Sequence, residues 1–120
     1  RMSEIERITN DLDRRTEPGD EILVAEPLYT INSESRQIIN LSRGVYLTRR
    51  APNSSVTVDL RQQMRKVVHS GAVPYMIMDS RTRSMLEASP KLAKTVETKY
   101  CEVSVGGVYN DLRNVRSSDF

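Results

Sequence analysis

The stretch Ala72-Val73-Pro74-Tyr75-Met76-Ile77-Met78 is the longest apolar run in this chain, and it anchors the predicted fold. It is too short to cross a bilayer, which takes about 20 residues in a helix, but it suits a compact, buried strand. Proline donates no hydrogen bond to a sheet, so Pro74 must stand at the start of that strand. We therefore predict a strand over 73–78 in the centre of a sheet.

Helical patterns stand on both sides of this strand. Before it, apolar residues recur at i, i+4, i+7 and i+8, which places them on one helix face: Leu60, Met64, Val67 and Val68. Gly71 suits the end of this helix, because glycine readily takes the left-handed conformation found there. After the strand, 80–88 is predicted to be helical. Ser89-Pro90 then begins another helix, since serine caps helices and proline fits their first turn.

The rest of the sheet comes from short runs with strand character, expected at 21–31, 37–41, 44–48 and 101–105. The close spacing of the first three favours an antiparallel meander. Residues 109–120 are polar, so we expect a tail there that frays. Short strands and helices without regular alternation indicate an α+β fold. The expected architecture is a small single domain with an N-terminal amphipathic helix, a mainly antiparallel sheet and two or three further helices.

The N-terminal helix is predicted over 3–15. Ser3 and Glu6 form an S-x-x-E capping box, in which each side chain bonds the other residue's backbone amide. The apolar stripe of this helix is only one residue wide per turn: Ile5, Ile8 and Leu12. A narrow stripe on a charged helix suits packing against a neighbour, and we predict that the chain self-associates through these three residues. The domain then comprises this helix at 1–16, a core at 20–108 and the tail at 109–120.

Composition indicates a globular intracellular protein. The 120 residues are 38% apolar and 28% charged, as in an ordinary folded domain. The single cysteine, Cys101, excludes an intrachain disulfide framework. The polar N-terminal residues lack the apolar segment of a secretory signal. We therefore expect a cytoplasmic or nuclear protein that is not secreted and has no membrane partner.

Charge is distributed unevenly along the chain. Residues 1–32 hold four basic and eight acidic side chains, whereas residues 33–85 hold nine basic and three acidic ones. The net charge of +2 hides this asymmetry. An acidic segment beside a basic one favours anionic partners, or contacts between unlike surfaces of two copies.

Basic side chains of the middle segment are the candidate anion-binding residues. Arg61 and Arg65 are four residues apart and share a helix face. Arg81 and Arg83 open the helix predicted at 80–88, where free backbone amides attract anions. The full candidate set is Arg49, Arg50, Arg61, Arg65, Lys66, Arg81 and Arg83.

Catalytic motifs do not stand out. A thiol nucleophile would require Cys101 and His69, the only residues of their kinds, to meet in space. One histidine and one cysteine leave too few ligands for a typical metal site, and the chain contains no phosphate-binding loop pattern. We therefore predict no metal and no cofactor, and the sequence favours binding over catalysis.

Three functional interpretations follow. The first is a non-enzymatic binding and assembly module that associates with itself or with a protein partner through surfaces of complementary charge. The second is a small nucleic-acid-binding domain, in which the Arg-rich segment at 36–83 contacts phosphates and Tyr29, Tyr46 and Tyr75 stack on bases. The third is an enzyme built on the Cys101–His69 pair. Nucleic-acid binding requires the basic residues to converge on one face.

Overall fold

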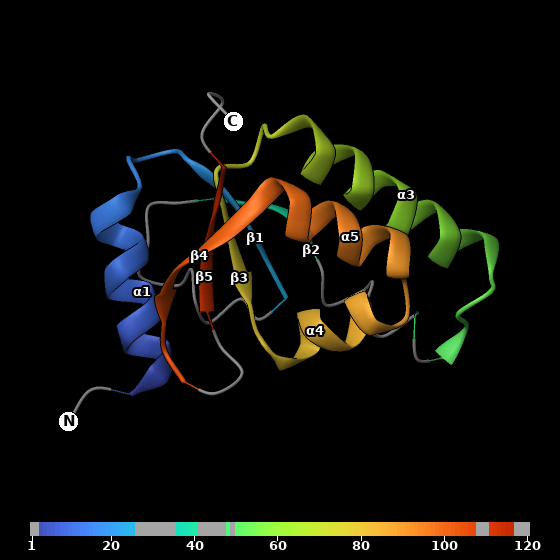
Figure 1. Cartoon of the computed structure of the whole chain (residues 1–120), viewed down its shortest axis with the longest axis horizontal. Helices are drawn as coiled ribbons and strands as arrows, with labels where there is room; N and C mark the ends of the chain where they lie inside the picture. The colour runs from blue at the N-terminus through green and yellow to red at the C-terminus, as the bar shows by residue number, and fades with distance from the viewer. Residues whose placement is uncertain (1–2, 26–35, 41–47, 49, 108–110, 117–120) are drawn as a thin grey trace.

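The computed structural model describes residues 3–25, 36–40, 48, 50–107 and 111–116, with 36–40 described through their backbone alone. Its helices and strands are, in chain order, α1 (Glu4–Arg15), β1 (Glu21–Val24), β2 (Arg36–Asn40), α3 (Ser55–Ser70), β3 (Tyr75–Met78), α4 (Ser80–Glu87), α5 (Pro90–Lys99), β4 (Tyr100–Val105) and β5 (Asp111–Val115) (Figure 1). The predicted α+β class and the N-terminal helix are confirmed. The predicted helices after the central strand are also present, as α4 and α5.

The sheet is mixed, with strand order β2-β1-β3-β5-β4. β3 is the central strand, as predicted. The longer ladders are the antiparallel ones that β5 forms with β3 and β4. β1, however, pairs in parallel with both β2 and β3, so the antiparallel meander predicted from residue 21 onward is wrong. The physical reason is that β1 and β3 are buried on both faces, which is the usual setting of parallel strands covered by helices. The strand predicted at 44–48 lies almost entirely outside the described residues.

β5 lies inside the sheet, between β3 and β4, so the prediction of a frayed tail is wrong for residues 111–115. Its Leu112 is fully buried. Its polar residues pair with each other, because the Arg113 Nε donates to Asp111 Oδ1 at 2.9 Å. A strand can therefore be polar in sequence and internal in the sheet when its charges are paired and its amides bond on both sides. Residues 117–120 of the predicted tail lie outside the described residues.

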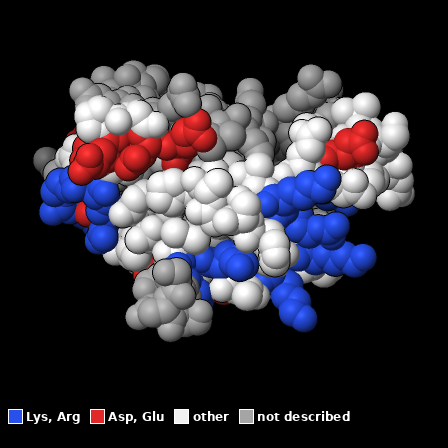
Figure 2. All heavy atoms as spheres, turned by 90° about the horizontal axis from the view of Figure 1, so that it is seen from above, with Lys and Arg blue, Asp and Glu red and all other residues white. Residues whose placement is uncertain are grey.

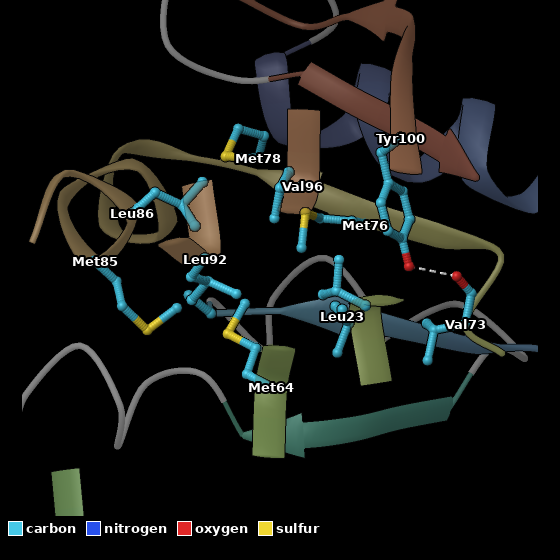
Figure 3. Close-up of a cluster of buried hydrophobic side chains, with 12 residues drawn as sticks. Leu23, Met64, Val73, Met76, Met78, Met85, Leu86, Leu92, Val96 and Tyr100 are labelled. Atoms are coloured by element: carbon cyan, nitrogen blue, oxygen red, sulfur yellow. Dashed lines mark hydrogen bonds between the residues drawn. The ribbon is translucent and has the colours of Figure 1, made fainter. Parts of the chain in front are cut away.

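Helices cover both faces of the sheet, which gives the molecule three layers (Figure 1). On β3, Tyr75 and Ile77 pack in the cluster beneath α1, while Met76 and Met78 pack in the cluster beneath α3, α4 and α5. Figure 3 shows the second cluster, in which Tyr100 also lies. β3 thus supplies side chains to both cores, which explains why the central strand is an unbroken apolar run.

α1 begins after Ser3, whose side chain accepts a hydrogen bond from the Glu6 amide at 3.2 Å, as the capping box predicts. Its apolar stripe packs on the chain's own sheet. Ile8 and Leu12 are fully buried, and Ile5 is 37% exposed. The packing is so close that a Cβ at Gly106 would lie 2.6 Å from Ile8 Cγ1, so only glycine fits there. The predicted self-association stripe therefore has little surface left for another copy while α1 is docked.

α3 is the helix predicted before the central strand. It ends at Gly71, which takes the left-handed conformation with a φ of 70°. Met64 and Val68 are buried, whereas Leu60 and Val67 are half-buried, so the buried face is narrower than the apolar pattern predicts. The solvent side of this helix carries the basic residues that line the candidate site.

Candidate functional site

A surface cleft of about 450 Å³ lies between the N-terminal half of α3 and the start of α5. Its lining combines apolar groups, among them Val58, Pro90 and Leu92, with three cationic side chains. Those cations are Arg61, Arg65 and Lys91. The cleft therefore offers apolar contact and positive charge to the same ligand.

Arg61 is held in place by the loop that precedes α3. Its guanidinium Nη2 donates a hydrogen bond to the Pro52 carbonyl oxygen. The loop itself is fixed where the Thr57 hydroxyl donates to the Ala51 carbonyl oxygen at 2.7 Å, and where Ser54 caps α3. The Arg61 Nε is shielded from solvent and has no hydrogen-bond partner in the described part of the chain. This donor is a buried polar group whose hydrogen-bonding capacity is unused, which costs stability.

The start of α5 contributes a second source of positive charge. The Ser89 side chain makes no capping hydrogen bond, and Pro90 at the first helical position has no N–H. The first backbone bond of the helix runs from the Ala93 amide to the Ser89 carbonyl oxygen at 3.0 Å. The amides of Lys91 and Leu92 therefore have no helical partner. Both residues line the cleft, so the positive end of the helix dipole lies at its edge.

The charge in the cleft is not compensated within the described residues. No ion pair there joins Arg61, Arg65 or Lys91 to a carboxylate, and the first turn of α5 holds no acidic residue. A lysine at a helix N-terminus is unfavourable by itself, because helix dipole and side chain have the same sign. Figure 2 shows Lys and Arg side chains gathered over the half of the molecule where α3 and α5 lie. An anion would relieve this accumulation of charge.

The structure brings together only part of the predicted basic set. Arg61 and Arg65 share the cleft, as their spacing predicts. Lys66 is exposed on α3 but does not line the cleft. Arg50 and Arg81 are exposed and each has an interaction partner, and Arg49 lies outside the described residues. Sequence reasoning missed Lys91, although the Ser89-Pro90 helix start beside it was predicted.

The predicted anion site at the start of α4 is already neutralised by acidic side chains of the chain itself. The Asp79 side chain accepts a hydrogen bond from the Thr82 amide at 2.8 Å. Arg83 pairs with Asp111, whose other carboxylate oxygen accepts from Arg113. Of the two arginines that sequence analysis assigned to a ligand here, Arg83 instead joins α4 to β5.

Arg113 extends this network to α5, since its Nη1 contacts Glu97 Oε1 at 2.6 Å. Burial alone would lower the pKa of Arg113, but its hydrogen bonds to Asp111 and Glu97 outweigh burial and raise it. The network is structural, because Asp111 is buried and each of its carboxylate oxygens accepts a hydrogen bond from one of the two arginines.

Other candidate groups lie apart from the cleft. Cys101 is half-buried on β4, His69 is exposed in the last turn of α3, and no hydrogen bond joins them in the described part of the chain. Tyr75 is 9% exposed and packs in the core, so it offers no stacking surface, while Tyr29 and Tyr46 lie outside the described residues. Within the same described ranges, no group of three or more His, Cys, Asp or Glu side chains is placed to hold a metal ion.

Comparison of the chain with protein-family models, curated proteins and solved structures finds no match. Among the described residues, no helix combines the length and hydropathy that a membrane span needs.

Proposed function

We propose that this chain is a non-enzymatic binding module that holds an acidic segment of a protein partner in the cleft between α3 and α5. The main support is the convergence of Arg61, Arg65, Lys91 and the uncapped start of α5 on one cleft. Carboxylates match this chemistry, because guanidinium groups and free helix amides both donate hydrogen bonds to them. The apolar lining adds contact for aliphatic side chains between the acidic ones.

The expected affinity is modest and sensitive to salt. Exposed ion pairs each contribute about 0.2–1 kcal/mol, and they weaken as the screening length falls from about 30 Å at 0.01 M salt to about 10 Å at 0.1 M. Such a site favours reversible association, in which charge sets the rate of encounter and the choice of partner.

Nucleic acid is the second candidate ligand. It is favoured by Lys66 and Lys94, two further cations that are exposed on the same two helices and do not line the cleft. It is disfavoured by the burial of Tyr75, since single strands are usually held by stacking on exposed aromatic rings. An acidic segment requires only the cleft, whereas a phosphate backbone requires the wider surface.

The test is fluorescence anisotropy with a labelled peptide of mixed glutamate and leucine residues, at low and moderate salt. The variant Arg65→Glu with Lys91→Glu should weaken binding at least tenfold, which corresponds to about 1.4 kcal/mol. Lys66→Glu with Lys94→Glu is the matched control, because it makes the same two charge reversals on α3 and α5 outside the cleft, and it should have a small effect.

Two results would contradict the proposal. One is the absence of peptide binding at low salt. The other is an equal loss of binding with Lys66→Glu and Lys94→Glu, which would show that the two helices attract anions without a defined site. Tight binding of a single strand or a duplex, weakened by Lys66→Glu and Lys94→Glu, would favour nucleic acid instead.

A further inference from the structure

The outer side of α1 and the residue just after its C-cap carry acidic side chains. Glu6 and Asp13 are seven residues apart, two helical turns, and they lie opposite the buried stripe. Glu17 follows the C-cap residue of the helix. All three side chains are exposed, and none forms an ion pair in the described part of the chain. We refer to Glu6, Asp13 and Glu17 as the acidic face.

Charge therefore separates into two regions of the folded molecule. Residues 3–25 hold seven acidic and three basic side chains, while residues 55–99 hold eight basic and four acidic ones. Figure 2 shows acidic side chains gathered toward the α1 end, with basic ones beside them, and mainly basic side chains over α3 and α5. The excess charges of the two regions are equal in size and opposite in sign, so each region is a match for the other on a second molecule.

Both surfaces are held rigidly. α1 is anchored by buried Ile8 and Leu12 and by Arg15, whose Nη2 donates to the Val103 carbonyl oxygen at 3.2 Å. On the other side, Arg61 is fixed by the Pro52 carbonyl oxygen. Association of rigid surfaces loses less conformational freedom than ordering a flexible segment does, which favours affinity.

We infer that the acidic partner of the cleft is a second copy of this chain, which presents its acidic face. This inference rests on the proposed function. The two surfaces differ and lie on separate elements, so the contact is heterologous. Each molecule offers one cleft and one acidic face, and a contact of this kind generates open chains or, where the rotation closes, rings. Assembly should grow with protein concentration and reverse with salt, because exposed charges are screened.

Sedimentation velocity at low salt tests this inference with two charge-reversal variants. The cleft variant carries Arg65→Glu and Lys91→Glu, and the acidic-face variant carries Asp13→Lys and Glu17→Lys. The unaltered chain should exceed its monomer mass of 13.7 kDa as concentration rises, and each variant alone should remain a monomer.

An equal mixture of the two variants should form dimers and stop there. The cleft variant keeps its acidic face and the acidic-face variant keeps its cleft, so one productive contact per pair remains. Circular dichroism melting of each variant checks that it is folded, and Lys91→Gln with Asp13→Asn provides a milder pair if a reversal unfolds the chain.

The inference is overturned if the unaltered chain stays a monomer at high micromolar concentration and low salt, or if both folded variants associate as it does. It is also overturned if the folded variants fail to pair when mixed. These failures differ from failure of the proposed function. If peptide binding still depends on Arg65 and Lys91 while the chain stays a monomer, the cleft serves a different acidic partner. If peptide binding is absent as well, the cleft itself is refuted.

Discussion

Alkaline pH should destabilise this protein through Tyr100. The side chain is 1% exposed, and its hydroxyl donates a hydrogen bond to the Val73 carbonyl oxygen at 2.6 Å (Figure 3). Burial disfavours the charged phenolate and raises the pKa of Tyr100 from 10.0 to about 12. Because the folded pKa lies above the unfolded one, its contribution to stability is complete below pH 10 and is lost as the pH rises to about 12.

The size of the effect follows from the shift in pKa. Raising the pKa from 10.0 to about 12, at about 1.36 kcal/mol for each unit, corresponds to roughly 3 kcal/mol of unfolding free energy. Tyr100→Phe removes this titration but leaves the buried Val73 carbonyl without its donor, which should cost about 1–3 kcal/mol at neutral pH. The unaltered chain should therefore be the more stable one at neutral pH, and the two stabilities should converge or cross as the pH approaches 12.

Urea unfolding followed by circular dichroism measures both stabilities at neutral pH and in steps between pH 10 and 12. Subtracting the variant from the unaltered chain cancels the titration of lysines and of the other tyrosines. A difference that stays constant over this range would refute the buried, hydrogen-bonded position of Tyr100.

Two further predictions concern the core and acid pH. Met64→Ala should lower the free energy of unfolding by about 2–5 kcal/mol, since Met64 is 2% exposed. Val56→Ala, on the exposed side of α3, should change it by less than about 0.5 kcal/mol, and equal effects in urea unfolding would contradict the docking of α3. Burial raises the pKa of Asp11, but hydrogen bonds from Ser104 and Arg15 and the nearby arginine charges outweigh it, so the pKa lies below 3.8. The contribution of Asp11 to the free energy of unfolding should be complete above pH 3.8 and should be lost as the pH falls below it. Urea unfolding of the Asp11→Asn variant over the same pH range should lack this pH-dependent contribution.

Features set by local pattern could be predicted from the sequence. The spacing of Met64 and Val68 gives α3, and the apolar run at 75–78 gives the central strand, because both patterns depend on near neighbours in the chain. The shared face of Arg61 and Arg65 was predictable for the same reason.

Features set by distant pairing could not be predicted in this way. The sequence of β5 is polar and therefore resembles a tail. Its Asp111 can be buried because Arg83, 28 positions away, neutralises it, and no local pattern indicates this pairing. Lys91 joins Arg65 only through the packing of α5 on α3, which no local pattern encodes. The spacing of the apolar stripe predicted the helix α1 correctly. Whether this stripe packs on the chain's own sheet or on another molecule depends on the room between the helix and the sheet. Gly106 provides that space, far along the chain.

The core fixes the position of the cations in the cleft. Arg65 directly follows Met64, and Lys91 directly precedes Leu92, while Met64 and Leu92 belong to the same buried cluster (Figure 3). The packing that joins α3 to α5 therefore brings two cations together on the solvent side, and their repulsion opposes that packing. An anion that neutralises them binds the folded chain in preference to the unfolded one, so its binding must raise the free energy of unfolding. If an anion occupies the cleft, its binding and the packing of the core are thermodynamically coupled, so a rise in the free energy of unfolding with added anion is expected.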